Sequence, residues 1–200
     1  MQSRPTGRSC PCRPHRLRRQ PYQSFSAFAG NPYFIDYRLL ADVGLLTADE
    51  VPAARPVGPI DYGALYNERP VVLKKAADRL LASPSPAYEA FCEAQSFWLE
   101  DYALFMAVKA EQGQAGLADW PDDLRCRKPE AIAAAKQRLA GAVDYYKAVQ
   151  FFFYTQWNAL KAYANGKGVR LVGDIPIYVS RIPAICGPTR SCSRPTEKCI

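Results

Sequence analysis

The sequence predicts an α/β protein that is predominantly helical, and two features of its pattern indicate this fold class. Residues 36–165 hold successive segments with helical spacing of apolar side chains, separated by loops that contain proline. After Gly166 and Gly168, the run VRLVGDIPIYV at 169–179 has the apolar, β-branched composition of a buried parallel strand. A helix, a glycine turn and a buried strand form an α/β unit.

Two aspartates mark the first helices. Asp36 is predicted to cap a short helix that runs to residue 46, and Asp61 to cap a second one that runs to about residue 83. The prolines of residues 47–60 indicate a surface loop between them. Pro70 is expected to interrupt the second helix, because proline removes a backbone donor and clashes with the preceding turn.

Two longer helical segments are expected after Pro86. In the first, aromatic and apolar residues recur at helical spacing, and this stripe is expected to face the core. The stripe consists of Tyr88, Phe91, Cys92, Phe97, Trp98, Tyr102, Phe105 and Met106. The second begins at Pro129, which suits a first helical turn, and is predicted to run without interruption to Asn165.

Positive charge is concentrated at the two ends of the chain. The formal net charge is +7, to which residues 1–20 contribute +6 and residues 181–200 contribute +3, so that residues 21–180 carry −2. The basic leader could bind nucleic acid through counterion release. It lacks the interleaved aromatic side chains on which bases stack, and we expect no nucleic-acid partner.

Cysteine and histidine limit the possible chemistry. Only Cys92 and Cys126 lie between the flanks, and they are expected to be isolated thiols in a reducing compartment, which favours the cytoplasm. No stretch is apolar enough for a signal peptide or a membrane span, although an organelle transit peptide is an alternative interpretation of the leader. His15 is the only histidine, so no metal site or catalytic triad is expected, and no cofactor.

Two features could carry a function. Asp174 follows a buried strand, and active sites of parallel α/β barrels lie at the carboxyl ends of the strands; it could equally cap a turn or pair with an arginine. The segment PYQSFSAFAGNPY combines aromatic rings with hydroxyl and amide groups, a mixture that suits sugars and also ordinary packed loops. Tyr22, Gln23 and Ser24 are therefore candidates for ligand binding.

Residues 21–180 resemble the amino-terminal part of amylomaltases, also called disproportionating enzymes, which are 4-alpha-glucanotransferases of the alpha-amylase clan. The motifs are PYQSFSAFAGNPYFID, DYGALY, FWLEDYALFMAVK and QWNALKAYANGKGVRLVGDIPIYV, in this order and spacing. The resemblance implies an incomplete (β/α)8 barrel in which 36–165 is mostly an inserted helical subdomain and VRLVGD is an early barrel strand. It also implies that Tyr22 and Asp174 contact the glucan.

The reaction implied by the resemblance transfers a segment of an α-1,4-glucan to glucose or a maltooligosaccharide. It is a retaining double displacement with an aspartate nucleophile and a glutamate acid/base. In the family these carboxylates lie on later strands than 169–179, so no catalytic residue is assigned and this chain is expected to be truncated and inactive. The alternatives are a non-catalytic α-glucan-binding module and a basic helical protein associated with nucleic acid.

Residues 1–20 and 181–200 depart from the family pattern. We expect residues 1–20 to be disordered or frameshifted, and residues 181–200 to be frameshifted. The family has a TGFGDS-like segment before PYQS and a DSADVWANPELF-like segment after IPIYV. With suitable synonymous codons, a shifted frame over 15–20 reads TGFGD, and one over 181–193 reads DSGDMWANPELF. The gene's nucleotide sequence tests this hypothesis. Because one strand cannot close a barrel, we also expect poor solubility.

Overall fold

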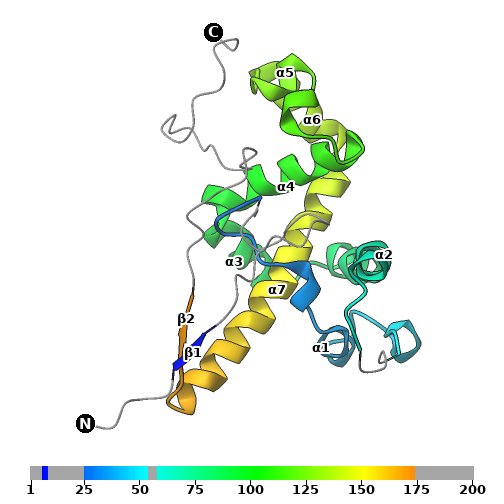
Figure 1. Cartoon of the computed structure of the whole chain (residues 1–200). Coiled ribbons are helices and arrows are strands. Elements are labelled where there is room, and N and C mark those ends of the chain that lie inside the picture. The colour runs from blue at the N-terminus through cyan, green and yellow to red at the C-terminus, as the bar shows by residue number, and fades with distance from the viewer. Residues whose placement is uncertain (1–5, 9–24, 54–57, 174–200) are drawn as a thin grey trace.

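The structure is a computed structural model that describes residues 6–8, 25–53 and 58–173. Its centre is the long helix α7, against which α2, α3, α4 and α6 pack (Figure 1). The helices are α1 (Tyr37–Asp42), α2 (Tyr62–Ala82), α3 (Pro86–Ala94), α4 (Ser96–Glu111), α5 (Asp122–Arg125), α6 (Pro129–Arg138) and α7 (Ala140–Gly166). Short 3-10 turns are η1 (Pro32–Phe34), η2 (Ala48–Glu50) and η3 (Leu117–Asp119).

The core consists of two clusters of buried side chains along α7. The first contains Trp98, Leu99, Tyr102 and Phe105 of α4 together with Val143 of α7. The second contains Leu73 and Leu80 of α2 together with Val149 and Phe152 of α7. Full burial of one such side chain stabilises the fold by about 1.5–3 kcal/mol. Because α7 contributes side chains to both clusters, it joins them into one core.

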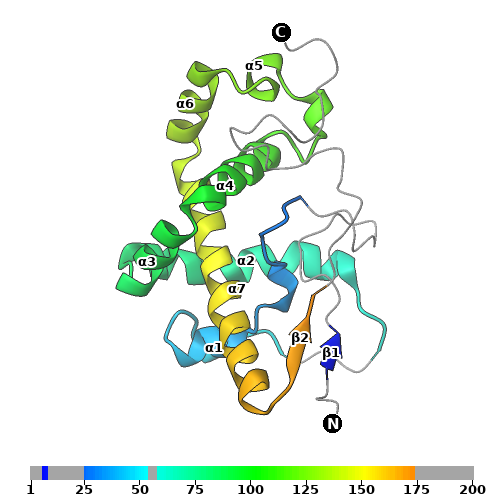
Figure 2. The ribbon, with the colours of Figure 1, turned by 90° about the vertical axis from the view of Figure 1, so that its left-hand side faces the viewer.

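A pair of parallel strands lies beside the carboxyl-terminal end of α7 (Figure 2). Strand β1 (Thr6–Arg8) pairs with β2 (Arg170–Val172), and Thr6 lies opposite Arg170. The strand expected from residue 169 is therefore confirmed at its start. Strand β1 was not predicted, because three residues in a basic leader carry no pattern that reveals a partner so distant in the sequence.

Most predicted helix starts are confirmed. The Oδ1 atom of Asp36 accepts a hydrogen bond from the Arg38 amide at 2.9 Å, and Oδ1 of Asp61 accepts one from the Ala64 amide at 3.0 Å. Pro86 and Pro129 each begin a helix, as expected. These contacts satisfy amides of the first turn that have no partner within the helix.

Two predictions about helix continuity were wrong. Helix α2 continues through Pro70, whose side chain is exposed, so water can hydrate the carbonyl that the proline leaves unpaired. The helix predicted from Pro129 to Asn165 is divided at Leu139, where ψ is 16° rather than helical. Gly141 lies two residues beyond this site, and the division allows α6 to pack on both α4 and α7.

Two further expectations need correction. Phe97 was assigned to the core stripe but is 66% exposed, because α3 ends at Gln95 and α4 starts with a different face toward the core. Cys126 was expected to be a free thiol, whereas it is disulfide-bonded in the structure. Cys92 is a free cysteine, as expected.

Candidate functional site

The described part of the sugar-type motif is the segment 25–36, which lies against α7 (Figure 2). A buried glutamine of α7 fixes its middle. Oε1 of Gln150 accepts a hydrogen bond from the Gly30 amide at 2.8 Å, and its Nε2 donates to the Gly30 carbonyl at 3.1 Å. The side chain of Gln150 thus replaces the strand partner that this irregular backbone lacks.

Gly30 permits a close approach between this segment and α7. A Cβ atom at residue 30 would lie 1.9 Å from Cδ1 of Phe153, which is far inside van der Waals contact. Phe153 itself is buried, with 6% exposure. Only glycine therefore fits between the segment and the aromatic face of α7.

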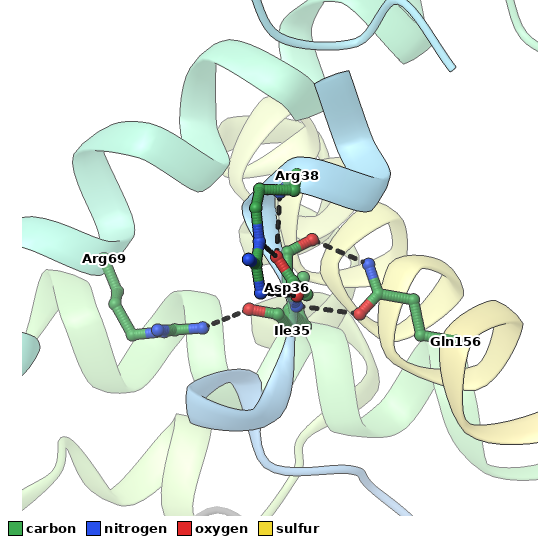
Figure 3. Close-up of polar contacts among 5 residues, drawn as sticks. All are labelled: Ile35, Asp36, Arg38, Arg69 and Gln156. Atoms are coloured by element: carbon green, nitrogen blue, oxygen red, sulfur yellow. Dashed lines mark hydrogen bonds and ion pairs between the residues drawn. The ribbon is translucent and has the colours of Figure 1, made fainter. Parts of the chain in front are cut away.

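A second set of contacts holds the end of the segment (Figure 3). Gln156 of α7 accepts a hydrogen bond from the Asp36 amide at 2.8 Å and donates one to the Asp36 carbonyl at 2.9 Å. From the other side, Nη2 of Arg69 donates to the Ile35 carbonyl. The carboxylate of Asp36 also pairs with Arg38 at 3.0 Å.

The surroundings of three titratable groups in this region shift their pKa values. The hydrogen bond from Arg38 lowers the pKa of Asp36, although slight burial opposes it. Burial lowers the pKa of Arg69, whose guanidinium lies 4.6 Å from the centre of the Tyr37 ring. Burial raises the pKa of Tyr33. Of these groups, Arg69 and Asp36 hold the backbone through hydrogen bonds with the Ile35 carbonyl and the Arg38 amide.

A general acid needs a raised pKa, whereas five carboxylates in the described ranges have a lowered one. Every resolved shift of a described carboxylate is downward. The affected residues are Asp36, Glu50, Glu100, Glu111 and Asp122. For Glu100 burial acts in the opposite direction, but Lys147 and Lys136 outweigh it. These five carboxylates are therefore held in their charged form by basic partners and hydrogen bonds.

Each of the predicted site residues lies outside the described residues: Tyr22, Gln23, Ser24 and Asp174. The structure describes their neighbours instead. Phe25, which follows Ser24, is buried against Phe105 at a ring-centre distance of 6.1 Å. Gly173, which precedes Asp174, follows the end of β2.

Sequence reasoning missed the residues that hold the segment 25–36. Gln150 and Gln156 interrupt an otherwise aromatic run of α7, and a buried amide in such a run indicates a specific polar partner. That partner lies 120 residues earlier in the chain, so the pattern could not identify it. No sequence pattern around Arg69 indicated that its side chain would bond the backbone of this segment.

Within residues 6–8, 25–53 and 58–173, no group of three or more histidine, cysteine, aspartate or glutamate side chains could hold a metal ion. None of the helices in those ranges has both the length and the apolar character that a membrane span requires.

The structure therefore defines a class: a predominantly helical α/β protein with a parallel strand pair and an aromatic segment fixed on a central helix. A family model described as 4-alpha-glucanotransferase matches residues 4–184. The chain belongs to the 4-alpha-glucanotransferase family, which confirms the resemblance seen in its motifs.

Individual relatives agree with this assignment. The chain is 45% identical to the 4-alpha-glucanotransferase of Thermus thermophilus over 164 residues, which cover 80% of this chain and 32% of the relative. It is 41% identical to that of Clostridium butyricum over 165 residues, which cover 80% and 34%. This chain spans about a third of the length of the curated relatives it matches.

A solved structure shows the same fold over most of the chain. The amylomaltase from Streptococcus agalactiae in complex with acarbose superposes with a TM-score of 0.83 at 35% identity. The match covers 88% of this chain and 37% of that chain. The helical arrangement around α7 is therefore that of the corresponding part of an amylomaltase.

Proposed function

We propose that the protein to which this chain belongs transfers segments of α-1,4-glucans to glucose or maltooligosaccharide acceptors by a retaining double displacement. The observation that carries this proposal is the family match over residues 4–184, together with relatives named 4-alpha-glucanotransferase. The reaction needs two carboxylates about 5–5.5 Å apart, one as nucleophile and one as acid/base. No cofactor takes part in it.

The parallel strands support the barrel that the resemblance implies. Strands β1 and β2 are parallel and are separated in the chain by the helical body, which is the connection that a (β/α)8 barrel with an inserted helical subdomain would have. We propose that these two strands are barrel strands and that 36–165 is the insertion. The body then extends over 21–180, and β1 joins it from within the leader 1–20.

Glucan contacts are proposed at both ends of the described body. Tyr22, Gln23 and Ser24 immediately precede the segment that Gln150 and Gln156 hold against α7. Asp174 follows β2 at the carboxyl end expected for an active site. We propose a cytoplasmic location, with which the free thiol of Cys92 agrees and the disulfide-bonded Cys126 does not.

A glucan-transfer assay tests whether this chain, besides belonging to the family, is itself active. Purified chain is incubated with maltotriose, and glucose and longer maltooligosaccharides are measured. We expect no turnover from this chain alone, because the resemblance places the catalytic carboxylates on barrel strands later than 169–179, and rapid turnover from the Thermus thermophilus relative as positive control. Robust disproportionation by this chain would contradict the assignment of the catalytic pair to another part of the protein.

A second candidate function is a non-catalytic α-glucan-binding module. The aromatic segment 25–36, which Gln150 and Gln156 hold on α7, favours it for this chain. It predicts that maltoheptaose binds without turnover and that Tyr22→Ala and Asp174→Asn each weaken binding. A folded chain that shows no heat of binding in calorimetry would exclude this role.

A further inference from the structure

Two exposed phenylalanine rings contact each other on the surface beside the segment 25–36. Phe28 is 44% exposed and Phe97 of α4 is 66% exposed. Their ring centres are 5.2 Å apart at an interplanar angle of 84°, an edge-to-face contact. Beneath them, Phe28 stacks on the buried Trp98 at 6.0 Å. We refer to Phe28 and Phe97 as the aromatic shelf.

The backbone under the shelf is held in place by hydrogen bonds. Oγ of Ser26 accepts from the amides of Phe28 at 3.0 Å and Ala29 at 3.1 Å. The hydroxyl of Tyr154 on α7 donates to the Phe28 carbonyl at 2.5 Å. Below the shelf, Nε1 of Trp98 donates to the side chain of Gln95 at 2.7 Å. The exposure of the two rings is therefore a property of a built surface and not of a loose loop.

Polar groups lie within one helical turn of the shelf. Glu100 and Asp101 follow Phe97 by three and four residues in α4, a spacing that places side chains next to one another on a helix. Asp101 pairs with Arg127 at 2.7 Å, and Glu100 pairs with Lys147 at 2.5 Å. An apolar surface with a charged rim is typical of a ligand site.

We propose that the aromatic shelf is a stacking site for the pyranose rings of an α-1,4-glucan. A glucose unit offers an apolar C–H face that fits an aromatic ring, and hydroxyls that can donate to the acceptor positions left on the ion-paired carboxylates of Glu100 and Asp101. The shelf begins four residues after Ser24 in the chain, so one glucan could reach both. This inference rests on the proposed function, which supplies the ligand, and it assigns an additional contact surface.

The test is to titrate the purified chain with maltoheptaose and to measure the heat of binding by isothermal titration calorimetry. Phe97→Ala is the main variant, because Phe97 is largely exposed and its removal leaves the core intact. We expect it to weaken binding about three- to tenfold, the effect of one lost stacking partner. Phe97→Trp should retain the wild-type affinity. Phe34→Ala is the matched control, since Phe34 is 58% exposed in the same segment and should not affect binding.

The outcomes show whether the shelf proposal fails alone or together with the proposed glucan binding. If wild type binds and Phe97→Ala and Phe28→Ala bind equally well, the shelf is overturned and the proposed function stands. If Phe97→Ala instead reduces self-association in sedimentation velocity without changing glucan affinity, the shelf contacts protein and the inference is wrong. A folded wild-type chain that binds no maltoheptaose rejects the shelf and the glucan-binding role together. Equal binding of cellohexaose would also contradict an α-1,4-glucan site.

Discussion

At the scale of single residues, the approach of Gly30 to Phe153 is the tightest constraint on the candidate site. Gly30→Ala places a Cβ atom 1.9 Å from the Phe153 ring, so the segment 25–36 must move away from α7. Overpacking of this kind costs about 1–3 kcal/mol, and displacement of the Gln150 hydrogen bonds adds to it. We predict a lower free energy of unfolding, measured by urea denaturation with circular dichroism.

Gly141→Ala is the control for that substitution. Gly141 lies in α7, and a Cβ atom there would meet nothing within 4 Å. Alanine has a higher helix propensity than glycine by up to about 1 kcal/mol, so this variant should be as stable as wild type or more stable. Combining Gly30→Ala with Phe153→Leu should recover part of the loss. Equal stability of Gly30→Ala and wild type would disprove the close approach.

The candidate site could be predicted only in part at this scale. The motif around Gly30 and Asn31 indicated a turn, and η1 confirms it, with Oδ1 of Asn31 accepting from the Tyr33 amide at 3.0 Å. The contacts of Gln150 and Gln156 join positions 120 residues apart, and local patterns do not contain such pairings. The glucan roles of Tyr22, Gln23, Ser24 and Asp174 stay predictions.

At the scale of elements, caps and prolines predicted helix starts well because their effect is local. Asp36 and Asp61 each bond an amide within three residues. The break at Leu139 could not be predicted, because it depends on where α6 packs, and tertiary packing overrides local propensity. Strand β1 depends wholly on its pairing with β2, for the same reason.

The contact between η2 and α2 gives a prediction about pH. Glu50 accepts a hydrogen bond from Arg79 at 2.5 Å and lies 3.3 Å from Nζ of Lys75. The hydrogen bond from Arg79, with the Thr47 amide, holds the pKa of Glu50 far below its usual range. A pKa that is lower in the folded state contributes stability above the unfolded value of about 4.3, and this contribution is lost as the pH falls.

We therefore predict that Glu50→Gln lowers the Tm at pH 7, by an amount on the order of 2 °C for a partly exposed pair. At pH 3 the difference in Tm between the variant and wild type should shrink. At this pH, below the unfolded pKa of Glu50, the ionised carboxylate stabilises the folded wild-type chain less. Thermal melts followed by circular dichroism at both pH values measure this. Glu93→Gln, at an exposed glutamate of α3 with no ion pair in the described ranges, should leave the Tm unchanged. A constant difference at both pH values would contradict the linkage.

At the scale of the whole molecule, the unpaired strand edges determine how the chain behaves in solution. In the described part of the chain, β1 and β2 pair only with each other, so each has an open edge. Val172 of β2 is 52% exposed, and Leu160 and Tyr163 on the adjoining end of α7 are 55% and 67% exposed. Open edges next to apolar side chains favour association between copies of a chain.

We predict that the purified chain self-associates and that Val172→Lys reduces this association several-fold, because a lysine on an edge strand opposes strand pairing between copies. Sedimentation velocity at several protein concentrations measures the oligomer fraction. Val71→Lys is the matched control: Val71 is 60% exposed but lies on α2, away from the strands, so its substitution should leave the oligomer fraction unchanged. If both lysine variants reduce association equally, net charge rather than the strand edge controls it. A monomeric wild-type chain would show that the open edges are protected in solution, and the expectation of poor solubility would then be wrong.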